Sequence, residues 1–172
     1  MAKSQIKIIG GYGRRMAHFT VARSVRAPAT ITWSTLTDWP RHAGWVPLTT
    51  VGVTTDRPDG VGAGFVARTG VGRLAFDDPM TVTVWQPPGG DAPGDRPGRC
   101  EVQKRGDFIR GRAWFTVTPL AGGHSHVVWG EDVTVWPHRL ARFTAPAFTV
   151  IGRVGFAATL RAMAREAASA AP

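Results

Sequence analysis

Apolar and polar residues alternate along much of the chain, which is typical of strands that bury one face. The alternation predicts strands at 17–26, 51–55, 65–69, 73–76, 80–86, 100–104, 109–118 and 126–136. Short turns rich in Gly, Pro and Asp separate most of them, and residues 87–98 form a longer loop of the same composition. This spacing favours sequential antiparallel hairpins.

Helical spacing replaces the alternation in two places. After the first strand, Pro28 is suited to begin a short helix that carries Trp33 and Leu36, and a second short helix extends from Asp38 to about Trp45. From about residue 140 to 168, apolar and small residues recur every three or four positions, which predicts a long amphipathic helix. The expected class is therefore α+β, with one strand, two short helices, about six further strands and a long C-terminal helix.

Composition narrows the class of protein. A length of 172 residues suits one domain, which we place at residues 16–172, with residues 1–15 as a flexible N-terminal extension. The net charge is +9, but the arginines are scattered, so we do not expect nucleic-acid binding.

Cys100 is the only cysteine, which rules out an intrachain disulfide, and neither a metal site nor a cofactor is predicted. Neither a membrane-spanning segment nor a signal peptide is expected, and a cytoplasmic location follows by default.

Several phrases in this order resemble the SRPBCC (START-like, helix-grip) superfamily, within it the actinobacterial polyketide cyclase/dehydrase and lipid-transport-like group. The phrases are Val25-Arg26-Ala27-Pro28, Gly60 to Phe65, Phe76-Asp77-Asp78-Pro79-Met80, Gly111 to Pro119 in alternation, and Val128 to Val133. The resemblance covers nearly all of the chain from Ala17 to about Arg165. It implies a helix-grip fold, in which a curved antiparallel sheet of six to seven strands wraps around the C-terminal helix and leaves a deep cavity.

Apolar side chains are expected to line that cavity, although each of them could equally belong to an ordinary core. The candidates for ligand binding are Trp33, Trp45, Phe65, Phe76, Met80, Val82, Val84, Cys100, Val102, Phe115, Trp129, Val133, Phe148, Gly152 and Phe156. Aromatic side chains are numerous among them, and such rings are common in the walls of ligand sites.

Five polar residues are candidates for chemistry. Glu131 shares a strand face with apolar neighbours, where it would serve as an anchor or acid–base group, or else pair with an arginine such as Arg112. His42 could transfer protons at the cavity mouth or simply pack between helices, and Arg68 could bind a ligand carboxylate or enolate oxygen or lie in solvent. The adjacent Asp77 and Asp78 point apart in an extended chain, so a turn-capping role is favoured over catalysis.

Two functions remain open at this point. The first is binding or transport of a hydrophobic small molecule, such as a lipid, a polyketide or an isoprenoid, in the internal cavity. The alternative is a polyketide aromatase/cyclase or dehydratase with Glu131 and His42 as proton-transfer groups. The oligomeric state is not predicted.

Overall fold

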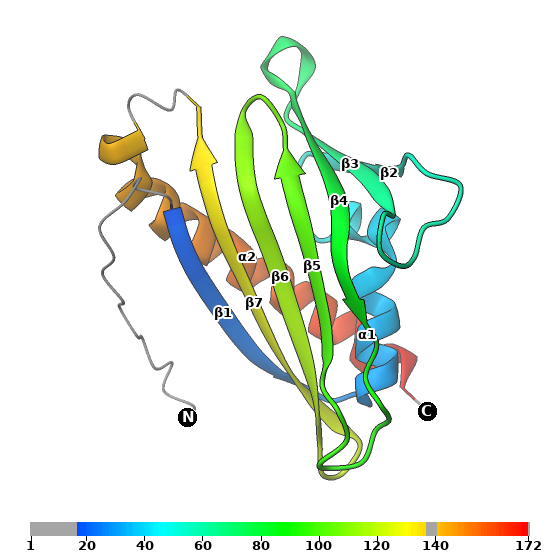
Figure 1. Cartoon of the computed structure of the whole chain (residues 1–172). Helices are drawn as coiled ribbons and strands as arrows, with labels where there is room; N and C mark the ends of the chain where they lie inside the picture. Colours follow the sequence, from blue (N-terminus) through cyan, green and yellow to red (C-terminus); the bar gives the residue numbers. More distant parts are fainter. Residues whose placement is uncertain (1–16, 137–140, 172) are drawn as a thin grey trace.

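Seven antiparallel strands form one curved sheet, and the helices lie together on one side of it (Figure 1). The structure is a computed structural model, and it describes residues 17–136 and 141–171. The strands are β1 (Ala17–Val25), β2 (Thr49–Val53), β3 (Gly64–Thr69), β4 (Phe76–Gln86), β5 (Gly98–Arg105), β6 (Ile109–Leu120) and β7 (His124–Val135). Their order in the sheet is β1-β7-β6-β5-β4-β3-β2. Within the described residues, only the β1–β7 pairing joins strands distant in sequence, and it brings the first of these strands beside the last.

The helical segments occupy the positions that the sequence predicts. They are α1 (Ala29–Thr37), the 3₁₀ helix η1 (Trp39–Gly44) and α2 (Ala141–Ala170). The α+β helix-grip fold is thereby confirmed. No helix among the described residues is long and apolar enough to cross a membrane. The expected extension at residues 1–15 lies outside the described residues.

One predicted strand is wrong. Residues 73–76 do not form a strand of their own, because Gly72–Leu74 is a short 3₁₀ turn, η2, in the β3–β4 connection. The next strand, β4, then begins at Phe76 and continues through Pro79 to Gln86. Leu74, one of the apolar residues that suggested a strand, lies at this tip and is 89 % accessible.

A β-bulge changes which face of β4 meets the core. The pairing with β5 shifts between Val82 and Val84, so the simple alternation of the sequence is interrupted there. Val82 is fully buried, whereas Val84 is only partly buried. Trp85 turns inward instead, with its ring 5.2 Å from that of Trp33.

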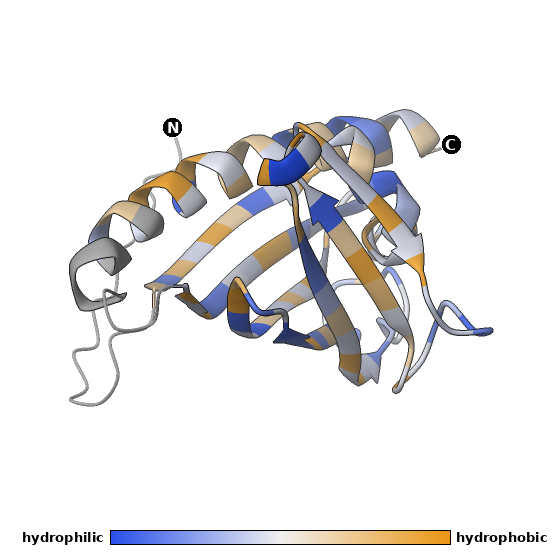
Figure 2. Cartoon of the chain, turned by 90° about the horizontal axis from the view of Figure 1, so that it is seen from above, coloured by the Kyte–Doolittle hydropathy of each residue, from blue (hydrophilic) through white to orange (hydrophobic). Residues whose placement is uncertain are grey.

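Helix α2 covers the sheet unevenly. Its C-terminal half contributes Leu160 and Met163 to the buried core, whereas Val150, Ile151 and Val154 in its N-terminal half are more than 60 % exposed. Figure 2 shows the helix lying across the sheet, with apolar and polar residues alternating along the strands beneath it. Close approach to β1 requires a residue without a side chain, because a Cβ at Gly152 would lie 2.7 Å from the Phe19 ring.

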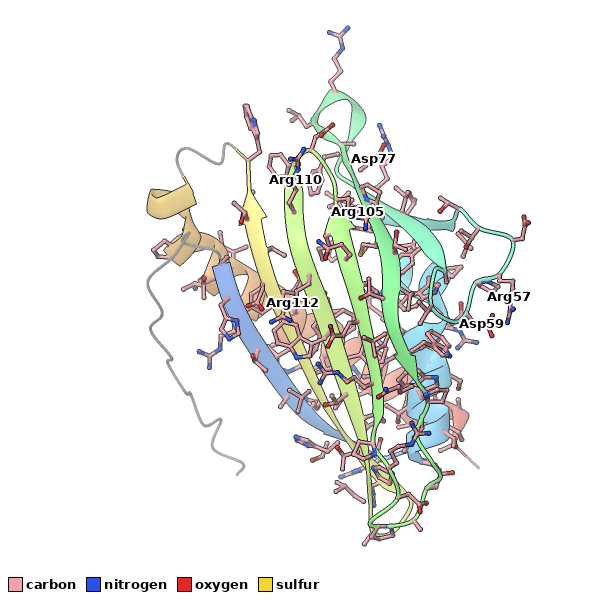
Figure 3. All side chains as sticks on the ribbon, viewed as in Figure 1. Arg57, Asp59, Asp77, Arg105, Arg110 and Arg112 are labelled. Atoms are coloured by element: carbon pink, nitrogen blue, oxygen red, sulfur yellow. The ribbon has the colours of Figure 1, made fainter. Side chains whose placement is uncertain are left out.

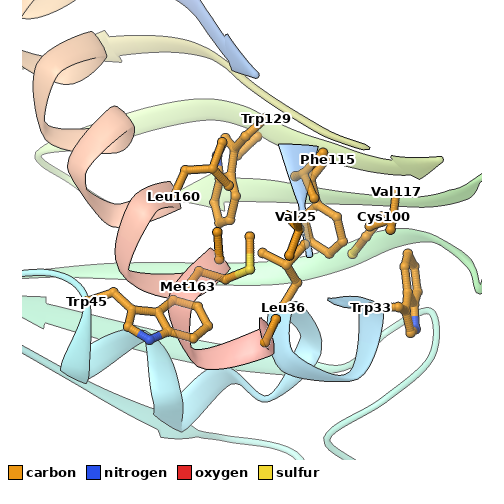
Figure 4. Packing of buried hydrophobic residues seen from close by; sticks show 14 of the residues in the cluster. Val25, Trp33, Leu36, Trp45, Cys100, Phe115, Val117, Trp129, Leu160 and Met163 are labelled. Atoms are coloured by element: carbon orange, nitrogen blue, oxygen red, sulfur yellow. The ribbon is translucent and has the colours of Figure 1, made fainter. Parts of the chain in front are cut away.

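The core lies between the concave face of the sheet, α1 and the C-terminal half of α2 (Figure 4). Two polar contacts attach η1 to α2: the Trp45 indole donates to Glu166 at 2.6 Å, and the Arg41 guanidinium donates to the same carboxylate at 2.7 Å. Helix η1 therefore closes the side of the core that α2 leaves uncovered.

A glycine in β6 should be essential for the register of the sheet. Gly111 has φ +145°, and a Cβ there would lie 2.0 Å from the backbone oxygen of Asp132 on β7. We expect Gly111→Ala to lower the free energy of unfolding by about 1–3 kcal/mol, as measured by urea denaturation. Gly52→Ala is the matched control, because no atom lies within 4 Å of its added Cβ. Equal losses of unfolding free energy in the two variants would contradict the essential role of Gly111 in the register of β6.

Candidate functional site

A cavity of about 200 Å³ lies between the concave face of the sheet, η1 and α2. Aromatic and aliphatic side chains make up most of its wall, together with a few ionisable groups. The lining residues are Trp39, His42, Val46, Thr49, Val51, Phe65, Ala67, Thr69, Phe76, Asp78, Met80, Cys100, Val102, Lys104, Ile109, Ala113, Trp114, Phe115, Trp129, Glu131, Phe156 and Thr159. Such a lining suits a largely apolar molecule with one polar end.

Three ionisable side chains meet in the cavity wall. The ammonium Nζ of Lys104 lies 2.7 Å from Asp78 Oδ2 and 3.5 Å from Glu131 Oε1. All three residues are at least 93 % buried. We call Asp78, Lys104 and Glu131 the ionic cluster. Burial of three charges in an apolar wall is costly unless they neutralise each other, so their mutual contact is required for the fold as well as available for chemistry.

The strand register explains how the cluster forms across the sheet. Lys104 on β5 lies opposite Gly111 on β6, and Glu131 on β7 lies opposite Ala113 on β6. Because the two β6 residues are small, the long lysine side chain can extend over this strand toward β7. Asp78 on β4 faces inward like Met80, which pairs directly with Lys104, and it therefore reaches the ammonium diagonally.

The cluster contains one positive and two negative ionisable groups. Desolvation raises the pKa of Glu131, and the nearby Asp78 raises it further, while Lys104 opposes the rise without cancelling it. Burial by itself would lower the pKa of Lys104, but attraction to Glu131 and Asp78 outweighs it and the net pKa is raised. Glu131, which lies farther from the ammonium than Asp78 does, therefore takes up a proton at a higher pH than an ordinary glutamate.

Two polar atoms of the cavity wall have unused hydrogen-bonding capacity. Within the described residues, Asp78 Oδ1 is buried and accepts no hydrogen bond. The Trp129 indole Nε1 lies near Glu131, but it makes no hydrogen bond of normal geometry with any described residue. An acceptor and a donor are therefore available to a polar group in the cavity.

His42 adds a neutral ring to the cavity wall. Its Nε2 lies 2.8 Å from the Leu36 carbonyl oxygen, which can only accept, so Nε2 carries the proton and Nδ1 is the bare acceptor. Burial lowers the pKa of His42 to about 4, hence the ring is uncharged at neutral pH. It packs between Trp45 and Trp129, at ring distances of 4.8 and 5.8 Å.

Cys100 also lines the cavity, but it is a poor nucleophile. Burial, with a smaller contribution from Glu101, raises the pKa of its thiol to about 12. The thiol remains protonated at neutral pH, and only the thiolate is strongly nucleophilic.

The structure divides the predicted apolar residues between cavity and core. Those that line the cavity are Phe65, Phe76, Met80, Cys100, Val102, Phe115, Trp129 and Phe156. The others belong to the surrounding packing: Trp33, Trp45, Val82 and Val133 are buried, Val84 is partly buried, and Gly152 contacts Phe19. The side chain of Phe148 lies outside the described residues.

The structure also divides the predicted polar residues between the cavity and the surface. Glu131 and His42 line the cavity, but the partner of Glu131 is Lys104, whereas Arg112 pairs with Asp132 at 2.9 Å. Arg68 lies away from the cavity as a half-exposed residue that donates to Asp77 at 2.9 Å. Asp77 and Arg112 lie on the face of the sheet turned away from α2 (Figure 3).

The sequence reasoning missed Lys104 and favoured a turn-capping role for Asp78, whereas both residues line the cavity. Alternation from Cys100 through Val102 places Lys104 on the inward face, and alternation from Phe76 to Met80 does the same for Asp78. The signal was therefore present, but a lysine at the end of a strand and an aspartate before a proline are more common at surfaces and turns.

Comparison with known proteins identifies the fold. No protein-family model and no curated protein sequence matches the chain. Among solved structures, the Zhui aromatase/cyclase from Streptomyces sp. R1128 superimposes with a TM-score of 0.63, at 18% identity, over 88% of this chain and 93% of that one. A protein from Thermus thermophilus gives a TM-score of 0.69, at 12% identity, over 90% and 99% of the two chains.

A norcoclaurine synthase from Thalictrum flavum gives a TM-score of 0.59, at 13% identity, over 95% of this chain and 97% of that one. These similarities confirm the helix-grip fold that the sequence predicts. At such identities the shared feature is the fold, and the residues of the cavity must be interpreted on their own.

The buried His42 should make the stability of the protein depend on pH. Between pH 6.5 and 4 the unfolded chain binds a proton at this ring and the folded chain does not, so stability is lost as the pH falls. His42→Gln can retain the bond to Leu36 without this titration. The difference in unfolding free energy between the two proteins should change by up to about 3 kcal/mol between pH 7 and pH 4. Urea unfolding at both pH values measures it, and a constant difference would refute the assignment.

Removal of the ammonium should destabilise the cluster strongly. Lys104→Met leaves Asp78 and Glu131 buried without a counter-charge, and we expect a loss of about 3–5 kcal/mol in unfolding free energy. The triple variant that also carries Asp78→Asn and Glu131→Gln removes both carboxylates and should regain part of that loss. If Lys104→Met were as stable as the parent protein in urea, the three groups could not be coupled as described.

Proposed function

We propose that this protein binds a small hydrophobic molecule inside the cavity, with the polar end of the molecule directed at the ionic cluster. The observation that carries the proposal is the apolar, aromatic-rich wall that contains one buried group of ionisable side chains with a bare acceptor atom. A core built for stability alone gains nothing from this arrangement, since an unsatisfied buried carboxylate oxygen lowers stability.

The size of the cavity limits the ligand. Its volume of about 200 Å³ is somewhat larger than the roughly 150 Å³ cavity that accommodates benzene in another protein. A molecule of one or two rings fits this space. A long acyl chain or an extended polyketide would require a wider cavity, so among the predicted ligand classes the compact ones are favoured.

Aromatic rings on several elements could enclose such a molecule. Trp39 stacks on Phe65 at 4.2 Å between ring centres, while Phe115, Trp129 and Phe156 form a chain of rings with spacings of 5.6 Å. These rings come from η1, β3, β6, β7 and α2, so the wall is continuous around the cavity. Ring–ring contacts would add to the burial of apolar surface as a source of affinity.

An enzyme of the aromatase/cyclase or dehydratase type is the second candidate. The specific observation in its favour is the ionic cluster, which holds two buried carboxyl groups around one ammonium, with the pKa of Glu131 raised by its burial. General acid–base catalysis requires groups of this kind within reach of the substrate. The fold shared with an aromatase/cyclase agrees with this candidate and also with a carrier.

Ligand capture and a cavity-filling variant test the proposal. Protein purified from producing cells is denatured, the released small molecules are identified by mass spectrometry, and binding is then followed by quenching of tryptophan fluorescence. Ala113→Leu fills space beside Glu131 and should weaken binding at least tenfold. The matched control is Ala22→Leu on the exposed face of β1, which should bind like the parent protein.

Either of two outcomes would count against the cavity as the binding site. One is the failure of every one- or two-ring compound to quench the fluorescence of the parent protein. The other is equal affinity of the Ala113→Leu, Ala22→Leu and parent proteins for the captured compound.

A further inference from the structure

The ionic cluster places a base and an acid against the same side of the cavity. Building on the ligand binding proposed above, we propose that the cluster enolises a ketone of one or two rings. Asp78 removes the hydrogen next to the carbonyl group, and Glu131 gives a proton to the carbonyl oxygen. Lys104 holds the two carboxyl groups together and donates a hydrogen bond to the same oxygen.

Asp78 is assigned as the base because one of its oxygens is occupied and the other is free. Oδ2 accepts from the Lys104 ammonium at 2.7 Å, which fixes the carboxylate in place. Oδ1 is buried and accepts no bond from a described residue. A buried carboxylate oxygen that has no donor is free to accept a hydrogen from a bound substrate.

Glu131 is assigned as the acid because it lies farther from the ammonium than Asp78 does, so a proton that reduces the negative charge of the buried cluster is placed there. Its oxygen Oε1 lies 3.5 Å from the same lysine nitrogen, so acid and base are attached to one centre. The ammonium has three hydrogens, two of which can serve the carboxyl groups. The third is available to the oxygen of a ligand, where it stabilises the negative charge that develops as the C–H bond breaks.

The reaction leaves the charge of the cavity unchanged. The C–H bond breaks, its proton bonds to Asp78 Oδ1, its electron pair forms the C=C bond, and the carbonyl oxygen takes the Glu131 proton. The cluster starts as carboxylate, ammonium and carboxylic acid and ends as carboxylic acid, ammonium and carboxylate, while ketone and enol are both neutral. A change in net charge costs much free energy in a cavity of low dielectric constant. A proton exchange that keeps the net charge constant avoids this cost.

The starting state can be restored through the lysine. Lys104 contacts both carboxyl groups, so it can give a proton to Glu131 in the same step in which it takes the one held by Asp78, and it remains an ammonium. The same step run in reverse returns the ketone, with the α-hydrogen replaced by one from the solvent if the proton on Asp78 exchanges. No oxidant, reductant or second substrate is needed.

Two other reactions are disfavoured by the same residues. Imine formation needs a neutral lysine amine, but the two carboxyl groups keep Lys104 in its ammonium form. Covalent attack by Cys100 needs a thiolate, and burial keeps this thiol protonated. Proton transfer by Asp78 and Glu131 is the remaining chemistry of the cluster.

Hydrogen–deuterium exchange of a ketone tests the proposal directly. The probe is 2-tetralone, a two-ring ketone with acidic benzylic hydrogens next to its carbonyl group. In buffered D₂O, loss of the C1 proton signal is followed by NMR with the parent protein and with Asp78→Asn and Glu131→Gln. The parent protein should accelerate the exchange over buffer, and each substitution should reduce that acceleration about 100-fold.

Asp77→Asn is the matched control, because Asp77 is the neighbouring carboxylate on the exposed face and pairs with Arg68. It should retain the exchange rate of the parent protein. Binding of 2-tetralone is measured in parallel by tryptophan quenching, and circular dichroism verifies that each variant is folded. Binding without acceleration by the parent protein, or equal rates for folded Asp77→Asn and Asp78→Asn, would overturn the proposed enolisation and leave the binding function standing. Failure of the parent protein to bind 2-tetralone would overturn the assigned ligand class.

Discussion

The architecture depends on one geometric constraint: a single helix cannot cover the concave face of a seven-stranded curved sheet. Helix α2 packs its C-terminal half onto the core, and α1 and η1 must close the rest. Aromatic side chains span the remaining distance, for example where Trp39 stacks on Phe65. What they leave is the cavity of about 200 Å³. The cavity is thus a result of how the layers meet, and its wall is built from residues that also hold the layers together.

A second constraint acts inside the cavity, where charge must be balanced without water. Lys104 can satisfy two carboxyl groups only because β6 offers Gly111 and Ala113 where other strands carry larger side chains. The backbone of β6 is correspondingly specialised, with a positive φ at Gly111. The same short stretch of β6, from Gly111 to Ala113, therefore affects both the pairing of the sheet and the charge balance of the ionic cluster.

Most of the fold could be predicted from the sequence, because periodicity reports directly which face of an element is buried. The prediction was wrong for residues 73–76, where an exposed apolar tip resembled a strand, and alternation could not reveal the bulge that turns Trp85 inward. The ionic cluster was harder to predict. Its members are far apart in sequence, and they meet only because the strands pair in one register with small residues between them. A single sequence does not display that register.

The uneven burial of α2 has a consequence for motion. Its C-terminal half is attached to η1 through Glu166 and buries Met163, whereas its N-terminal half exposes Val150 and Ile151 and contains Gly152 and Gly155. Local opening requires little free energy where few apolar contacts must be broken. Amide hydrogens in the first half of the helix should consequently exchange with solvent by small local fluctuations, and those in the second half only when the whole domain unfolds. The C-terminal half of α2 would then form a fixed wall, and its N-terminal half would open by local unfolding.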